Sequence, residues 1–367
     1  MPTIQAPIPI TIPGRIESIT AFKQHGRQVA AVLPIHYPRA LLRAFDLLPV
    51  EVWGPPGIGA GRGAVHLQPY ICSIAHNALS YLQDGRLDLA DVIIVPHACD
   101  SLQGLGSLLL DFVKPSQPVF PLYIPRANHE RDIDFFADEL RSLYQKLAGA
   151  TGVTPSDEAL MQAIQREQDA DDLLAELHLS NQNLPLNSRD LYRLIRSREY
   201  LPAEIFTELA QQTLSTAAGP SSVGIPVLLS GILPEPMGLF ALLEELGARV
   251  VGDDLACCGR RIYPPGESDD PFRRMAESIL FAPPDPTRGT PIHERSSHLT
   301  GLAQSTGAKG IIFFPVKFCE PELFDLPLLR QELGEAGLPS LVIEIDLNEP
   351  PSHQMRNRLG AFLEMLE

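Results

Sequence analysis

The chain has 367 residues, of which 44% are hydrophobic, and it carries a formal net charge of −16 at pH 7. This length is enough for two or three domains with a sizeable core. The acidic balance argues against general nucleic-acid binding and against docking on an anionic membrane surface. Five cysteines are too few and odd in number for a disulfide scaffold, so a reducing cytoplasm is the expected compartment.

No targeting or membrane-spanning segment is expected. Residues 1–14 lack the basic region before an apolar core that marks a signal peptide. The apolar stretch 225–243 is interrupted by prolines and by Glu235, so it is not expected to cross a bilayer.

The first segment, residues 1–150, alternates short β-branched strands with stretches of helical spacing. The expected strands are 28–37, 50–54, 91–99 and 119–125, and the expected helices are 38–48, 71–85 and 101–113. Such alternation predicts an N-terminal α/β domain whose parallel sheet has helices on its faces.

The middle segment, residues 151–221, is predicted to be a helical insertion without strands. Helical patterns cover 154–181, 186–200 and 201–218, and a small-residue linker follows at 217–224. Thr154 with Asp157 resembles the capped start of the first of these helices.

Residues 222–367 return to the alternating pattern and are predicted to form a C-terminal α/β domain. The expected strands are 225–231, 248–254, 310–318 and 340–346, and the expected helices are 237–247, 270–280, 293–307, 323–337 and 352–366. The predicted fold class is therefore α/β, with two parallel-sheet domains and a helical insertion between them.

Cysteines follow the third predicted strand of both α/β domains. Cys99 ends the run DVIIVPHAC and Cys319 ends the similar run GIIFFPVKFC, while Cys72 lies shortly before the first of these. In parallel sheets the carboxyl edge of the strands is where ligands bind. Three thiols from two halves of the chain favour one soft metal centre, such as an iron–sulfur cluster with one open iron. The alternative is three core cysteines, since the chain has no CxxC pair.

Six segments in a fixed order carry a resemblance to a known family. They are 28–54, 69–76, 95–101, 228–261, 307–322 and 338–366. Together they resemble the 2-hydroxyacyl-CoA dehydratase family, which includes benzoyl-CoA reductase subunits, and specifically subunits of the D-component type. The resemblance covers nearly the whole chain.

The resemblance implies a fold, a cofactor and partners. It implies two flavodoxin-like domains and a 4Fe–4S cluster held by Cys72, Cys99 and Cys319. Such subunits pair with a homologous second subunit, as a homodimer or a heterodimer, and receive electrons from an ATP-dependent iron–sulfur activator. The dehydratases act on an acyl-CoA through a ketyl radical and are oxygen-sensitive. The reductases instead reduce an aryl- or enoyl-CoA.

The chain departs from this family pattern at a vicinal cysteine pair. Cys257 and Cys258 could supply an additional cluster ligand, and the alternative is a purely structural role. His36 and Tyr37 follow the first strand and are the catalytic candidates, expected to face the cleft, although a lone histidine at a strand end is often structural. His97 could tune a cluster by hydrogen bonding to sulfur, and packing is its alternative.

Several charged residues near strand ends have both functional and ordinary interpretations. Arg62, in the glycine-rich stretch 54–63, and Arg260 with Arg261 could meet CoA phosphates or could lie on the surface. The glycine-rich stretch lacks the strand-then-helix context of a dinucleotide site. Asp100 and Glu320, which follow their cysteines directly, are expected to cap the next helices.

Three functions remain open from the sequence. The first is a lyase or reductase subunit acting on an acyl-CoA, the second is a non-catalytic subunit that relays electrons, and the third is a metal-free α/β protein.

Overall fold

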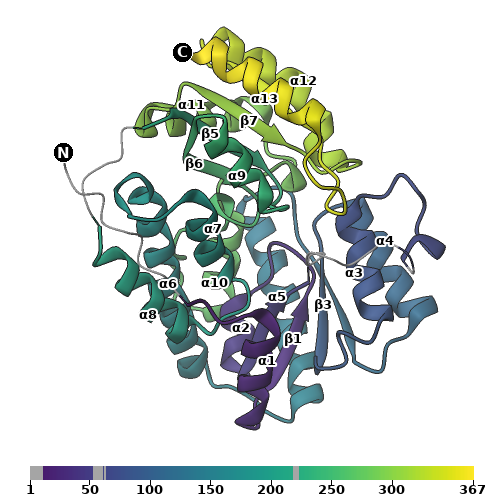
Figure 1. Ribbon diagram of the computed structural model, residues 1–367. Helices are drawn as coiled ribbons and strands as arrows, with labels where there is room; N and C mark the ends of the chain where they lie inside the picture. Colours follow the sequence, from purple (N-terminus) through teal and green to yellow (C-terminus); the bar gives the residue numbers. More distant parts are fainter. Residues whose placement is uncertain (1–10, 53–60, 62, 218–222) are drawn as a thin grey trace.

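The chain folds around two four-stranded parallel sheets (Figure 1). The computed structural model describes residues 11–52, 61, 63–217 and 223–367. The strands of the first sheet are β1 (Gln28–Val32), β2 (Leu47–Glu51), β3 (Val92–His97) and β4 (Val119–Tyr123). Those of the second sheet are β5 (Ile225–Gly231), β6 (Ala248–Leu255), β7 (Gly310–Phe314) and β8 (Ser340–Val342).

The two sheets repeat the same strand order. The first runs β2-β1-β3-β4 and the second runs β6-β5-β7-β8, with every pairing parallel. Relative to its own first strand, each order is 2-1-3-4, as in flavodoxin-like folds. The predicted fold class is confirmed, and the continuous apolar runs of β3 and β7 are strands buried on both faces.

Helices cover both sheets and fill the segment between them. Their bounds are α1 (Arg15–Gln24), α2 (Arg39–Ala44), α3 (Ser73–Gln83), α4 (Asp100–Leu108), α5 (Glu130–Thr151), α6 (Asp157–Leu179), α7 (Ser188–Ser197), α8 (Ala203–Leu214), α9 (Gly238–Glu245), α10 (Pro271–Leu280), α11 (Ile292–Thr306), α12 (Glu320–Glu335) and α13 (His353–Leu366). Five short η segments complete the described elements.

The described part of residues 151–221 is helical and contains no strand. Helix α6 begins after Ser156, whose Oγ accepts a hydrogen bond from the amide of Ala159 at 3.2 Å. The cap is therefore Ser156 and not Thr154, because the chain enters the helix two residues later than the capping pattern indicated.

One part of the C-terminal segment packs on the first sheet. Tyr263 and Met275 belong to the same hydrophobic cluster as Ala30 and Val32 of β1. Helix α10 accordingly packs against α5. Because these contacts cross the predicted borders, the division at residues 150 and 221 stays a prediction.

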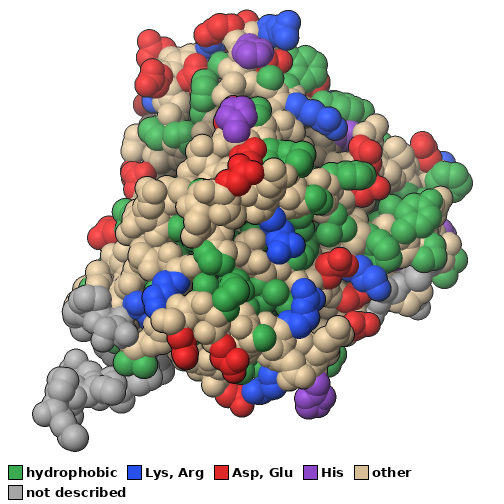
Figure 2. All heavy atoms as spheres, turned by 90° about the horizontal axis from the view of Figure 1, so that it is seen from above, with side chains coloured by type: hydrophobic (Ala, Val, Ile, Leu, Met, Phe, Trp, Pro, Cys, Tyr) green, Lys and Arg blue, Asp and Glu red, His purple; other side chains and the backbone are tan. Residues whose placement is uncertain are grey.

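The surface carries mixed charge, and no described helix is long and apolar enough to cross a bilayer. On the face drawn in Figure 2, acidic and basic side chains are interspersed, with hydrophobic side chains between them. The net charge of −16 thus does not gather into one acidic patch on that face.

Candidate functional site

Three cysteines each stand immediately before a helix. Cys72, Cys99 and Cys319 are the residues that precede α3, α4 and α12, respectively. Cys99 follows β3 and Cys319 follows β7, so both lie at the carboxyl edge of the third strand of their sheet. Cys72 and Cys319 are buried and Cys99 is partly exposed. The first-turn amides of three helices are thus directed toward three thiols.

The charges of these thiols act on one another. Burial raises the pKa of Cys99 to about 12, and the neighbouring Cys72 adds to the rise. Burial also raises the pKa of Cys319 well above its usual range, with further contributions from Cys72 and Cys99. The three thiols, from both halves of the chain, therefore influence one another's pKa.

Helix α3 is attached to the second half of the chain beside Cys72. The Oγ of Ser73 accepts a hydrogen bond from the amide of Leu347 at 3.3 Å. One turn later, the side-chain amides of Asn77 and Asn348 bond reciprocally at 3.1 and 3.0 Å. These contacts hold the start of α3 against the loop that follows β8.

Two cavities border Cys99. One has a volume of about 200 Å³ and the other about 280 Å³, and both are lined by Cys99, Asp100, Arg126 and Thr287. The larger one also reaches Glu320 in the first turn of α12. The candidate site is therefore a cleft between the carboxyl edges of the two sheets.

His36 lines the smaller cavity. Its Nδ1 lies 3.1 Å from the hydroxyl of Tyr263, and its Nε2 lies 3.2 Å from Oγ1 of Thr287. The residue has a φ of 57°, in the left-handed region that non-glycine residues rarely adopt. Burial lowers its pKa to about 3, so the imidazole is neutral.

The hydrogen bonds around His36 determine its tautomer. Thr287 donates its hydroxyl hydrogen to Asp285 at 2.5 Å, so its oxygen must accept from Nε2–H of His36. At the other end, Arg261 donates to the oxygen of Tyr263 at 2.5 Å, which leaves the phenolic hydrogen for Nδ1. A neutral, Nε2-protonated imidazole thus joins the two halves of the chain.

The buried state of His36 makes stability depend on pH. Its folded pKa lies below the ordinary value of 6.5, so stability is lost as the pH falls below 6.5. A His36→Asn variant tolerates the left-handed backbone and does not titrate. Between pH 7 and pH 5 we expect the unfolding free energy of the unmodified protein to fall about 2 kcal/mol more than that of the variant. Urea titrations at both pH values measure this difference, and parallel losses would contradict it.

Tyr37 points away from the cleft. Its hydroxyl donates to Glu199 at 2.5 Å, and the side chain lines a separate cavity of about 90 Å³ together with Arg39. Burial raises the pKa of Tyr37 and the charge of Glu199 adds to this effect. Tyr37 lines neither of the cavities beside Cys99, so its position does not support the expected catalytic role.

His97 and the two acidic residues lie at the cleft. His97 lines the smaller cavity and packs edge-to-face with Tyr123, with ring centroids 4.5 Å apart. Asp100 and Glu320 are the first residues of α4 and α12, where the helix dipole stabilises a negatively charged carboxylate. The N-cap positions themselves are occupied by Cys99 and Cys319, so the expected caps are displaced by one residue.

Cys257 and Cys258 are fully buried beside a different set of charges. Their Sγ atoms are 3.8 Å apart. Burial raises the pKa of Cys257, and Arg196 opposes that rise. Arg196 itself is paired with Glu51 at 2.7 Å. The pair thus adjoins a buried arginine–glutamate contact.

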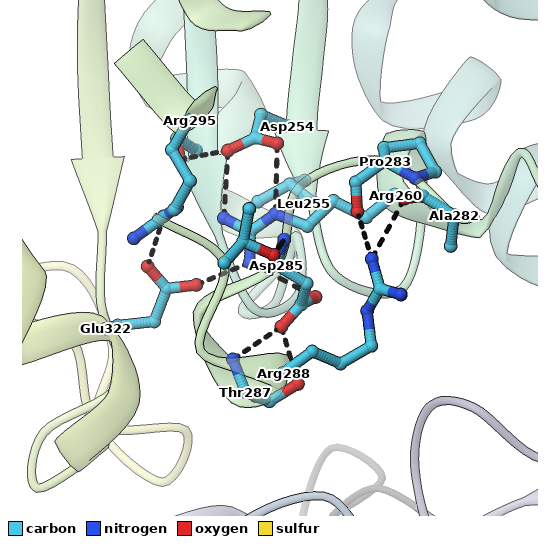
Figure 3. A network of polar contacts seen from close by, with 12 residues as sticks. Asp254, Leu255, Arg260, Ala282, Pro283, Asp285, Thr287, Arg288, Arg295 and Glu322 are labelled. Atoms are coloured by element: carbon cyan, nitrogen blue, oxygen red, sulfur yellow. Dashed lines mark hydrogen bonds and ion pairs between the residues drawn. The ribbon is translucent and has the colours of Figure 1, made fainter. Parts of the chain in front are cut away.

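Arg260 is the centre of a buried ionic cluster (Figure 3). It bonds Asp254 at 2.8 Å and Glu322 at 2.7 Å, and it lies 3.5 Å from Asp285. Glu322 belongs to the first turn of α12, the helix that begins directly after Cys319. Neither of the two interpretations of Arg260, a CoA-phosphate contact or a surface position, fits this arrangement, because three carboxylates surround its buried guanidinium.

Arg261 is buried in a similar way. Its Nε lies 3.3 Å from Glu199, and its ring contacts include Tyr263. It is 1% exposed, so it does not present its charge to a ligand at the surface as expected. Arg62 and residues 54–60 lie outside the described residues.

Three residues of the cleft escaped prediction from sequence. Arg126, Thr287 and Arg288 line the smaller cavity but carry no recognisable motif. The turn formed by Pro286–Arg288 was the only available indication, because a proline and a threonine after Asp285 are typical of a tight turn.

The donor set at the cleft fits an iron–sulfur cluster. Thiolates are the ligands of such clusters, and three thiols before three separate helices match three irons of a cubane. Within the described ranges, no three His, Cys, Asp or Glu side chains form a group that could hold a single metal ion. Cysteines of a cluster bind different irons, so their spacing differs from that of ligands around one ion.

Comparisons with known proteins agree on one family. A family model described as 2-hydroxyglutaryl-CoA dehydratase, D-component, matches residues 34–366. The (R)-phenyllactyl-CoA dehydratase beta subunit of Clostridium sporogenes is 27% identical over 94% of this chain and 93% of its own length. The (R)-2-hydroxyglutaryl-CoA dehydratase subunit beta of Acidaminococcus fermentans is 26% identical over 95% of both chains. A benzoyl-CoA reductase subunit of Thauera aromatica is 24% identical over 93% of this chain and 91% of its own length.

Proposed function

The chain belongs to the 2-hydroxyglutaryl-CoA dehydratase D-component family, and we propose that it is the iron–sulfur subunit of an enzyme that dehydrates a 2-hydroxyacyl-CoA. The proposal is supported by the positions of Cys72, Cys99 and Cys319, each of which directly precedes a helix, and by the effect of these thiols on one another's pKa. The reaction class is inferred from family membership, and the redox cofactor is inferred from the three thiols.

Cys72, Cys99 and Cys319 would hold a 4Fe–4S cluster. When bound, such a cluster exchanges one electron at a time, as a ketyl-radical elimination of water requires. Burial of Cys72 and Cys319, which are 7% and 8% exposed, keeps bulk water from the ligands. The positive ends of α3, α4 and α12 favour the negative charge of the thiolates.

The cleft residues would orient the thioester. His36 is a neutral imidazole whose two ring nitrogens bond Tyr263 and Thr287, so it forms a fixed, uncharged part of the cavity wall. Fixed polar groups cost little reorganisation during a reaction. We therefore assign His36 a positioning role.

A reductase is the second candidate, because one relative is a benzoyl-CoA reductase subunit. That enzyme class would retain the electrons in an aryl- or enoyl-CoA product, whereas a dehydratase would release water. Both candidates share the same three thiols, so the product distinguishes them.

A second subunit and an activator complete the proposed enzyme. Each of the relatives described above is named as a subunit, which implies a partner chain. Phe324 and Leu328 lie one turn apart on α12 and are 75% and 56% exposed, as expected of a protein-binding face. A separate ATP-dependent iron–sulfur activator would supply the electron.

Anaerobic purification followed by iron and sulfide analysis tests the proposal. We expect the protein to contain both iron and sulfide, and its cluster spectrum to change when a 2-hydroxyacyl-CoA is added. Product analysis by mass spectrometry should show loss of water, whereas a gain of hydrogen would favour the reductase. Absence of iron would leave a metal-free protein, and a spectrum that responds to no thioester would favour an electron-relay subunit.

A further inference from the structure

The smaller cavity beside Cys99 contains more polar groups than the fold requires. Its volume is about 200 Å³, and its wall includes His97, Arg126 and Arg288 in addition to Cys99. Asp100 is the carboxylate among the lining residues, and it is exposed. The cationic side chains therefore outnumber the carboxylate at this wall.

Arg288 is a buried cation whose hydrogen bonds go to carbonyl groups. Its Nη1 donates to the carbonyl of Leu280, the last residue of α10. Its Nη2 donates to the carbonyls of Ala282 and Pro283 just beyond the helix (Figure 3). No carboxylate among the described residues forms an ion pair with it, because Asp285 is directed to Arg260 and Thr287. The charge of Arg288 at the cavity wall is thus incompletely balanced.

Other polar atoms of this wall lack partners. The Nε of Arg288 and both ring nitrogens of His97 are buried and have no hydrogen-bond partner in the described part of the chain. Buried polar groups are normally satisfied, by protein atoms, by water or by a ligand. Unsatisfied donors from two elements that border one cavity indicate that something polar occupies it.

Arg126 is the free cation of the cleft. It is exposed, it borders both cavities, and within the described ranges it has neither an ion pair nor a hydrogen bond. A guanidinium offers a planar fork that matches a carboxylate or a phosphate. Its position beside Cys99 places this fork at the proposed reaction site.

We propose that this cavity binds an oxyanion of the substrate, a carboxylate or a phosphate, with Arg126 as its principal contact and Arg288 as a fixed positive background. The inference rests on the proposed function only in taking the oxyanion from an acyl-CoA. Its two sources are a carboxylate at the far end of the acyl group and a phosphate of CoA.

Isothermal titration of the anaerobically purified protein, together with any subunit that copurifies, tests the site. The probes are glutarate, inorganic phosphate, glutaryl-CoA and pentanoyl-CoA. The variant is Arg126→Gln, and Arg131→Gln is the matched control because Arg131 is also exposed, at the start of α5. We expect at least a tenfold weaker affinity for glutarate or phosphate in the first variant and no change in the second.

The thioester pair identifies the source of the oxyanion. If the acyl carboxylate is bound, glutaryl-CoA binds more tightly than pentanoyl-CoA and Arg126→Gln removes the difference. If a CoA phosphate is bound, the variant weakens both thioesters equally. Unchanged affinities for every probe in Arg126→Gln would overturn the proposal. Binding of glutarate or phosphate that depends on Arg126, without binding of either thioester, would uphold the oxyanion site and reject the acyl-CoA function.

Discussion

Anaerobically purified Cys72→Ser, Cys99→Ser and Cys319→Ser variants are expected to lose most of their iron and sulfide and all cluster-dependent activity. Each thiol stands at the start of a different helix, so no neighbouring cysteine can replace it without moving a helix. Serine is close in volume and keeps a polar group, so the fold should persist. Iron and sulfide analysis with circular dichroism separates loss of cluster from loss of fold.

The vicinal cysteines provide the matched control. Cys257→Ser and Cys258→Ser change the same atom at residues that are 1% and 0% exposed, beside Arg196. We expect both variants to retain the iron content of the unmodified protein. Loss of iron in either variant would mean that the ligand set is larger than three, and full iron content in Cys99→Ser would remove Cys99 from the set.

The sheets and the position of the thiols were predictable because local sequence patterns encode them. Strands β3 and β7 are continuous apolar runs, as expected of strands buried on both faces of a parallel sheet. Once two such runs end near a cysteine, the carboxyl edge follows from the fold class. The family comparison adds the chemistry that these patterns do not contain.

The charged interior was not predictable because its contacts join distant parts of the chain. Arg260 meets Glu322, which is 62 residues away, and Arg39 meets Glu199, which is 160 residues away. From the sequence alone, Arg260 and Arg261 in the motif GRR cannot be distinguished from an exposed basic pair. Only tertiary packing shows that carboxylates from β6, α12 and the turn at Asp285 converge on Arg260.

The directions of adjacent loop residues were equally inaccessible. His36 and Tyr37 are neighbours in a segment whose φ values are positive at Ile35 and His36. This local reversal sends His36 toward Thr287 and Tyr37 toward Glu199. Strand periodicity, on which the expectation of a shared cleft position was based, ends before these residues.

Arg260→Met is expected to lower the unfolding free energy by about 3–5 kcal/mol, the usual cost of removing one partner from a buried ion pair. Methionine fills much of the volume but leaves Asp254, Asp285 and Glu322 without their shared cation. Urea denaturation measures the loss. Arg273→Met is the control, because Arg273 pairs with the exposed Glu130 and Asp134. We expect the unfolding free energy of this variant to stay close to that of the unmodified protein.

The pH dependence separates this electrostatic loss from a packing defect. Burial raises the pKa of Asp285, but Arg260, His36 and the hydrogen bonds from Thr287 together hold that pKa well below its usual range, and Arg260 is the largest of these opposing contributions. Without Arg260 the largest contribution that opposes burial is lost, so we expect the folded pKa of Asp285 to rise above the unfolded one and protonation then to favour the folded state. The deficit of Arg260→Met should therefore shrink as the pH falls from 7 to 5. A deficit that is constant over this range would indicate lost packing, and the carboxylate cluster around Arg260 would then not be the origin of its stabilising effect.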